Sequence, residues 1–288
     1  MLKTKLRYYR DLTKKSIFIF VEKFFKVHIT PVHYYSPIPT VSELKPDIFT
    51  KVNDCVGVEF SDDSQLNNMK LIFSQYLREY TPRVNEGLSQ VDSFVLYAMI
   101  RNRKPRVLIE IGSGESTKIS LSALSKNRDE GVECQFTAIE PFPNSFLKQV
   151  EKKNFRLIES NVQDVDLDLL SQADILFIDS SHVAKIGSDV NYEIHDIVPR
   201  LKVGALVHWH DIMIPVDYPK GWLENGNMFW NESYMVHAFM MHNKSFRIVW
   251  ASRYMQINYP EQLHVTFEYF KPKDPGQQLS SFWVERVG

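Results

Sequence analysis

The sequence of 288 residues predicts an α/β fold: a mostly parallel sheet of about seven strands, flanked by helices and preceded by an N-terminal helical extension. Two observations carry this prediction. Short apolar runs alternate with helix-like segments, which is the pattern of parallel strands joined by crossover helices. A glycine turn or an acidic side chain follows most of these runs directly. Ligands of parallel sheets bind where the strands end, so the residues after the runs are expected to share one site.

The first run, residues 107–111, ends in a glycine turn and leads into a helix-like segment. Glycine has no Cβ, so Gly112 and Gly114 let a ligand come close to the backbone. Thr117 stands where a dinucleotide site needs its third glycine or alanine, and where a phosphate loop needs glycine before its lysine. Glu110 would repel a pyrophosphate but suits a ligand that is cationic or bears hydroxyls. S-adenosylmethionine, which has an ammonium group, a sulfonium and no phosphate, is such a ligand.

Residues 110–114 resemble the first motif of class I S-adenosylmethionine-dependent methyltransferases, which implies their Rossmann-like sheet. The second run, residues 135–140, ends in Glu140, thirty positions after Glu110, a spacing that suits one strand–helix–strand unit. A carboxylate there can accept hydrogen bonds from both ribose hydroxyls; a helix-capping or surface acid is the alternative. The expected cofactor-binding residues are Glu110, Gly112, Ser113, Gly114, Ser116, Thr117, Glu140, Pro141 and Asp179.

Three further apolar runs complete the expected parallel strands, at residues 155–158, 173–179 and 205–211. Two later runs, residues 246–250 and 264–269, are expected to form an antiparallel pair at the sheet edge.

A narrower resemblance is to a bacterial methyltransferase subgroup that modifies glycans and natural products. It rests on residues 33–39, 178–182, 208–211, 215–222 and 229–232, and it covers about residues 30–288. The resemblance implies a saccharide or glycoconjugate acceptor.

Composition limits the possible partners and compartments. A net charge of −1 gives no sign of a nucleic-acid partner. Two cysteines without a Cys-x-x-Cys pair argue against a disulfide framework and fit a reducing, cytoplasmic location.

Residues 1–28 differ from the rest of the chain. They hold eight Lys or Arg against two acids, so they carry +6 and the remainder carries −7. Their apolar side chains recur with helical spacing, at Ile17, Phe20, Val21, Phe24 and Phe25. Two interpretations stay open: a helix packed on the core or on a partner subunit of a homo-oligomer, and a basic helix on the anionic inner membrane face. Residues 1–85 are treated as a leader and lid region before a methyltransferase domain at 86–288.

The chemistry needs a way to remove a proton. Methyl transfer from a sulfonium is an in-line displacement, so donor and acceptor must be aligned and the acceptor hydroxyl deprotonated by a base or with a metal ion. His182 and His210 are the candidate bases, beside Asp179 as a third catalytic residue. Asp179, His210 and Asp211 are also a candidate set for Mg²⁺ or Mn²⁺, because carboxylate oxygens are hard ligands.

Aromatic side chains crowd the segment after the fifth run and are expected to form the acceptor pocket. The candidate substrate-binding residues are Tyr218, Trp222, Trp230 and Glu232. The expected function is S-adenosylmethionine-dependent O-methylation of a saccharide or glycosylated metabolite. The alternatives are N-methylation of an amino sugar, another reaction on the same scaffold, and a catalytically silent S-adenosylmethionine-binding subunit of a glycan-assembly complex. Asp179, His182 and Asp211 argue against the silent subunit, because binding alone does not need them.

Overall fold

The computed structural model describes residues 15–40, 42–81, 87–151, 153–272, 274 and 276–288. Contacts divide the chain into two compact units, Met1–Ile48 and Phe49–Gly288. This division falls well before the expected boundary at residue 85. The reason is packing: Met69, Phe73 and Tyr76 are buried in the same core as the helix that leads into the sheet, so the expected lid helix belongs to the larger unit.

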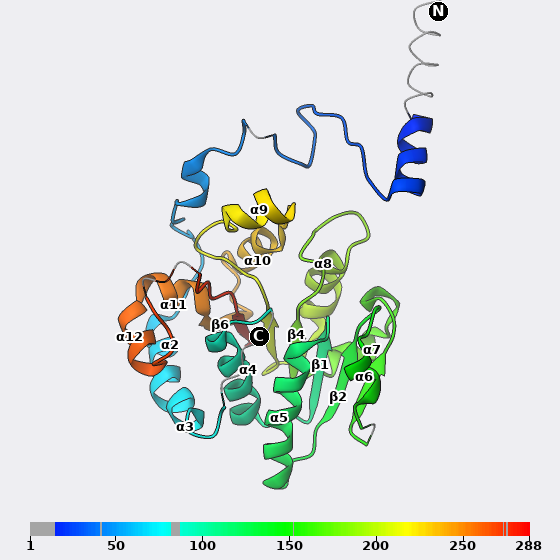
Figure 1. Ribbon diagram of the computed structural model, residues 1–288. Coiled ribbons are helices and arrows are strands. Elements are labelled where there is room, and N and C mark those ends of the chain that lie inside the picture. Colours follow the sequence, from blue (N-terminus) through cyan, green and yellow to red (C-terminus); the bar gives the residue numbers. More distant parts are fainter. Residues whose placement is uncertain (1–14, 41, 82–86, 152, 273, 275) are drawn as a thin grey trace, which may run out of the picture. The chain divides into compact units, whose positions relative to one another are not determined.

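A seven-stranded sheet forms the centre of the larger unit, in the order β3-β2-β1-β4-β5-β7-β6 (Figure 1). The strands are β1 (Val107–Ile111), β2 (Gln135–Ile139), β3 (Phe155–Ile158), β4 (Ile175–Ile178), β5 (Leu206–Trp209), β6 (Phe246–Ala251) and β7 (Phe282–Arg286). Strands β1 to β5 pair in parallel, and β7 pairs antiparallel with both β5 and β6. The predicted fold class is confirmed.

Helices cover both faces of the sheet, which is why most side chains of its central strands are apolar and buried. In β1, Leu108 contributes to a core that contains α4 and α5, whereas its neighbour Ile109 contributes to a second core with the segment from α8 to η5. Residues 15–25 are helical, and the helical segments between them and β1 are η1 (Pro46–Phe49), α2 (Asp62–Asn68), η2 (Met69–Phe73), α3 (Ser74–Tyr76) and α4 (Gln90–Arg103). Those between β1 and β5 are α5 (Glu115–Asp129), α6 (Ser145–Gln149), η3 (Val162–Asp164), α7 (Leu167–Ser171), α8 (Asp189–Tyr192), η4 (Glu193–Ile197) and η5 (Val198–Arg200). Those after β5 are α9 (Lys220–Gly226), α10 (Glu232–Met240), α11 (Ser252–Asn258) and α12 (Pro260–Thr266).

One expected strand is wrong. Residues 264–269 were expected to pair with β6, but they lie at the end of α12 and in the turn after it, and β7 takes that place in the sheet. Pro260 suits the first turn of a helix, where its missing N–H is not needed. Leu263 and Phe267 are both buried, four residues apart, while Val265 between them is exposed. This is helical spacing, and a short apolar run does not distinguish it from a strand.

A buried carboxylate joins α4 to the antiparallel edge of the sheet. Asp92 is fully buried and accepts hydrogen bonds from the hydroxyl of Ser252 at 2.5 Å and from the backbone N–H of Ser280 at 3.0 Å and Ser281 at 3.3 Å. The N-cap residue Ser89 donates to the same carboxylate at 2.8 Å. The carboxylate therefore fixes the start of α4 against the residues that enter β7.

Among the helices of the described residues, none combines the length and apolar content that a membrane span requires.

We expect Asp92→Ala to lower the free energy of unfolding by roughly 2–4 kcal/mol, because each buried donor left without an acceptor costs about 1–3 kcal/mol. Urea denaturation measures this change. The matched control is Asp129→Ala on the exposed end of α5, which should change stability by less than about 0.5 kcal/mol. Equal unfolding midpoints for the two variants would show that the Asp92 network does not stabilise the fold.

Candidate active site

The glycine turn after β1 lies directly against the end of β4. Gly112 has a φ of +75°, and a Cβ there would lie 1.8 Å from the carbonyl oxygen of Asp179. Only glycine fits this position without moving the backbone of β4. The close approach brings the turn and Asp179 to one rim, as the sequence analysis predicts for residues that directly follow the apolar runs.

Glu110 lies beneath this turn. It is fully buried, and its two carboxylate oxygens accept hydrogen bonds from Ser116 at 2.5 Å and Thr117 at 2.6 Å in the first turn of α5. Burial raises the pKa of Glu110 to about 8, although the two hydroxyl donors oppose that rise. The three side chains thus face one another and join β1 to α5. The structure does not bring them to the cleft, where the sequence analysis expected cofactor contacts.

A cleft of about 490 Å³ opens at the carboxyl ends of β1 to β4. It is lined by residues 111–112, 139–142, 160–163, 179–181, 185 and 187–189, which include the predicted Gly112, Glu140, Pro141 and Asp179 but not Ser113 or Gly114. The carboxylate of Glu140 accepts hydrogen bonds from the N–H of Ser113 at 3.1 Å and of Phe142 at 2.8 Å. A carboxylate has about four acceptor sites, so Glu140 can also accept from ribose hydroxyls. The size and the acid fit a nucleoside cofactor without phosphates.

Next to the cleft, three side chains converge: Asp179 directly after β4, His182 in the loop that follows, and Asp211 just after β5. His182 Nε2 lies 3.3 Å from Asp179 Oδ1 and 3.8 Å from Asp211 Oδ2. One ligand atom from each of the three residues lies within 4.8 Å of the other two, which is close enough for a single metal ion. The other ring nitrogen of His182, Nδ1, lies 2.8 Å from Glu232 Oε2. His182 is buried and has a φ of +58°, a left-handed conformation that a non-glycine residue seldom adopts.

Charge in this cluster decides the protonation of His182. Burial alone would lower the pKa of His182, but the hydrogen bonds to Asp179 and Glu232 outweigh burial and raise that pKa to about 11. The imidazole is therefore protonated at neutral pH in this arrangement and cannot accept a proton. The prediction of His182 as a general base does not fit the cluster as it stands. With a cation beside the aspartates, a neutral His182 would turn its Nε2 lone pair to the metal and donate Nδ1–H to Glu232.

His210 lies beside Asp211 but does not belong to the group of three side chains that could share a metal ion. Its Nε2 lies 3.1 Å from the carbonyl oxygen of Gly87 and 3.5 Å from Asp211 Oδ1, and its Nδ1 has no hydrogen-bond partner among the described residues. Burial lowers the pKa of His210, but the charges of Asp211 and Asp179 raise it more. A carbonyl oxygen only accepts, so Nε2 carries the proton in the neutral ring. The predicted metal set is corrected accordingly: His182, not His210, joins the two aspartates.

Three aromatic rings lie over the cluster. The ring of Trp230 lies 4.3 Å from that of His182, and Trp222 lies 5.2 Å from Trp230. Tyr218 lies 6.1 Å from each tryptophan and is buried, whereas the two tryptophans are half-buried. Trp230 thus contacts His182 directly, and Tyr218 and Trp222 pack around Trp230.

Glu232 was expected to bind the acceptor, but the structure buries it beneath His182, where it orients the imidazole. Sequence reasoning also missed two supporting residues. Glu193 is fully buried and accepts a hydrogen bond from Ser180 at 3.1 Å, and Ser280 donates one to Asp211 at 2.9 Å. No motif marks either residue. The only signal for Glu193 was a glutamate within a helix-like segment that also has several apolar residues, and that pattern is not specific.

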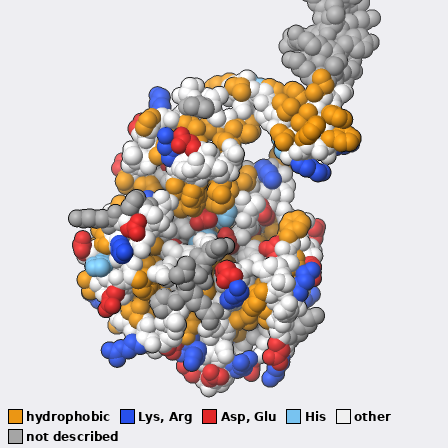
Figure 2. Space-filling model, viewed as in Figure 1, with side chains coloured by type: hydrophobic (Ala, Val, Ile, Leu, Met, Phe, Trp, Pro, Cys, Tyr) orange, Lys and Arg blue, Asp and Glu red, His pale blue; other side chains and the backbone are white. Residues whose placement is uncertain are grey.

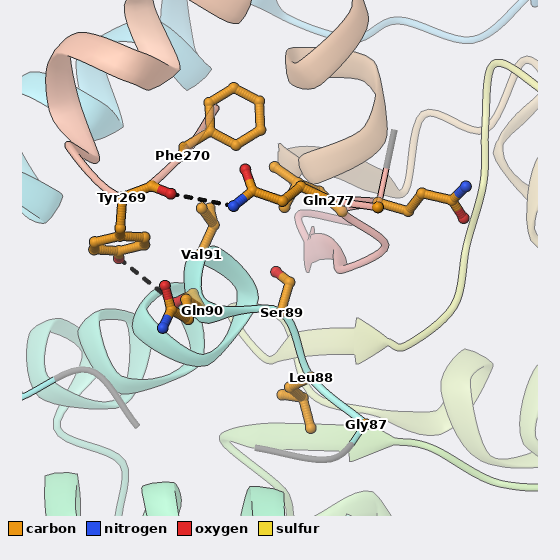
Figure 3. A pocket seen from close by; sticks show the side chains of 11 residues that line it. Gly87, Leu88, Ser89, Gln90, Val91, Tyr269, Phe270 and Gln277 are labelled. Atoms are coloured by element: carbon orange, nitrogen blue, oxygen red, sulfur yellow. Dashed lines mark hydrogen bonds between the residues drawn. The ribbon is translucent and has the colours of Figure 1, made fainter. Parts of the chain in front are cut away.

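A second cavity of about 450 Å³ lies at the start of α4 (Figure 3). Tyr269 donates a hydrogen bond to the carbonyl oxygen of Gln90, and the amide of Gln277 donates to that of Tyr269, so both polar side chains are engaged within the fold. Gly87 lines this cavity and also accepts the hydrogen bond from His210. The backbone of Gly87 therefore lies between the cavity and the base candidate.

The chain is similar in sequence or in fold to several known proteins. Residues 109–212 match a family described as a methyltransferase domain. An uncharacterized protein from Archaeoglobus fulgidus is 31% identical over 156 residues, which are 48% of this chain and 70% of the relative. Among solved structures, the SAH-bound Podospora anserina methyltransferase PaMTH1 is 14% identical, with 78% of this chain and 88% of that chain covered and a TM-score of 0.46. The O-methyltransferase TomG from Streptomyces achromogenes, in complex with SAM, is 13% identical, with 80% and 92% covered and a TM-score of 0.46.

We expect Glu140→Ala to weaken binding of S-adenosylhomocysteine by roughly 1–3 kcal/mol, the usual loss when a charged hydrogen-bond acceptor is removed. Isothermal titration calorimetry measures this affinity. Glu133→Ala, at the opposite end of β2 and exposed, is the matched control and should bind as the unaltered protein does. Tight binding of NAD together with no response to S-adenosylhomocysteine would contradict the assignment of the cleft.

Proposed function

Because the chain belongs to the class I S-adenosylmethionine-dependent methyltransferases, we propose that it methylates a hydroxyl oxygen of a saccharide or glycosylated metabolite. The observation that carries this proposal is the cluster of Asp179, His182 and Asp211 beside the cleft. A hydroxyl must lose its proton on methylation, and a cluster of this kind can promote that loss by holding a metal ion beside the hydroxyl. An amine has its own lone pair, and a silent binding subunit activates nothing, so neither alternative explains why the cluster is there.

The cleft residues define how the cofactor would be held. Glu140 would accept the ribose hydroxyls, residues 160–163 would border the adenine, and the backbone at Gly112 would allow close approach. Asp179 lines the cleft and also belongs to the cluster, so the reacting end of the cofactor would lie beside His182. The cofactor supplies an electrophilic methyl group on a sulfonium.

The donor set fits a divalent cation. Asp179 and Asp211 would provide carboxylate oxygens and His182 would provide Nε2, a combination that suits Mn²⁺ and is compatible with Mg²⁺. Bound there, the ion would lower the pKa of an acceptor hydroxyl. Glu232 would hold the ring of His182 in place through Nδ1, and Ser280 would hold Asp211. Without a metal ion, His210 is the base that remains, because its Nδ1 is unpaired among the described residues.

The aromatic side chains support a saccharide as acceptor. Trp222 and Trp230 are half-buried, so part of each ring is open to a ligand, and the face of an aromatic ring packs well against the CH groups of a sugar. Trp230 also contacts His182, so a sugar stacked there would have a hydroxyl near the cluster. Lys220–Gly226, the helix α9 that carries Trp222, has no fully buried residue, which leaves it free to adjust around an acceptor.

We expect His182→Ala to lower kcat by roughly 10²–10⁴-fold, the usual range when proton removal is lost. Affinity for S-adenosylhomocysteine should stay nearly unchanged, because His182 does not line the cleft. Turnover is measured by mass spectrometry on a panel of glycosides and nucleotide sugars. His195→Ala, an exposed histidine on η4, is the control and should keep full activity.

Chelation separates the two routes of proton removal. Activity that is lost with EDTA and restored by Mn²⁺ or Mg²⁺ would support the metal route. Activity that is unchanged by EDTA would indicate that His210 removes the proton from the acceptor, and His210→Ala should then lower kcat. If both histidine variants keep full turnover in the presence of EDTA, neither route is correct.

A further inference from the structure

The described part of the leader exposes an aromatic cluster. Residues 15–25 are helical, and the side chains of Phe20, Phe24 and Phe25 are 52%, 72% and 67% exposed. The ring of Phe20 lies 4.5 Å from that of Phe24 and 6.3 Å from that of Phe25, so the three rings form one patch. Figure 2 shows hydrophobic side chains gathered over this helix. A continuous apolar patch of this kind normally marks an interaction surface.

The helix is amphipathic and basic. At 100° per residue, Ile17, Phe20, Val21, Phe24 and Phe25 share one broad face, which leaves Lys15 and Lys23 on the other side. The pattern continues after the helix, where Val32, Tyr34 and Tyr35 are exposed. Residues 1–28 carry +6 in total. A helix with aromatic residues on one face and lysines on the other is typical of segments that lie in a membrane interface.

We infer that residues 15–35 bind the surface of a bilayer that contains anionic lipids, with the phenylalanine cluster in the acyl boundary and the lysines among the head groups. Charge favours this occupant over a partner helix or the core. An apolar groove would cover the phenylalanine rings equally well, but it would gain nothing from the positive charge. That charge is +2 in residues 15–28, and the preceding fourteen residues add +4. The remaining 260 residues carry −7, so an anionic surface repels the rest of the chain and the contact is confined to the leader. This inference does not depend on the proposed methyl acceptor.

Co-sedimentation of the full-length protein with vesicles tests the inference. Vesicles of phosphatidylcholine with phosphatidylglycerol should retain the protein at low salt and release it at high salt, whereas vesicles of phosphatidylcholine alone should not retain it. Each lysine near an anionic surface contributes about fivefold in affinity, so Lys15→Gln, Lys23→Gln and Lys26→Gln together should weaken binding by about 10²-fold. Changing the three phenylalanines of the cluster to Ser should abolish binding.

Matched controls lie on the larger unit. Leu71→Ser and Val265→Ser remove apolar side chains that are 71% and 80% exposed, and they should leave vesicle binding unchanged. Vesicle binding that does not depend on phosphatidylglycerol, or that is unchanged in the phenylalanine variant, would overturn the inference. A phenylalanine variant that melts at a lower temperature, or that changes from dimer to monomer in light scattering, would also overturn it, because the helix would then pack on this protein. Calorimetry with S-adenosylhomocysteine should give the same affinity for every variant.

Discussion

The balance of charge around His182 is the constraint on which the site depends. Its two ring nitrogens reach carboxylates from the end of β4, the end of β5 and the start of α10. Carboxylates this close together and largely buried would repel one another strongly without a positive charge between them. In the structure the imidazolium supplies that charge. A divalent cation would supply more of it and would free His182 to act as a ligand. A positive charge among these carboxylates therefore offsets part of the repulsion where the ends of two strands and one helix meet.

The parallel strands and the antiparallel edge of the sheet contribute different parts of the site. The parallel strands β3, β2, β1 and β4 form the cleft, and the close approach of Gly112 to Asp179 joins that cleft to the cluster. The antiparallel edge supports the cluster from the other side, because Ser280, just before β7, donates its hydroxyl to Asp211. Asp92 in turn fixes the backbone of Ser280. The cluster is thus supported by the same hydrogen bonds that hold α4 against the sheet.

Sequence patterns predicted the parts of this protein that repeat a simple period. Strands β1 to β5 followed from buried apolar runs, and the glycine turn followed from the residue types that a close approach requires. The period fails for α12, since Leu263 and Phe267 lie in a run too short to separate helical from strand spacing. Periodicity also did not predict the cluster. The left-handed backbone at His182 directs its side chain toward the aspartates, and no sequence pattern indicates that conformation. The roles of Glu232 and Ser280 depend on contacts across 50 and 69 positions, which only the folded chain creates.

The order of these elements along the chain has a consequence for synthesis on the ribosome. Every residue that lines the cofactor cleft lies between positions 111 and 189. The cluster is complete only later, with Asp211, Glu232 and finally Ser280 at the entry to the last strand. A nascent chain would thus have all the residues of the cleft well before it has Asp211, Glu232 and Ser280. Cofactor bound at that stage could act as a template for folding, which would give the binding half of the site a structural role that precedes its chemical one.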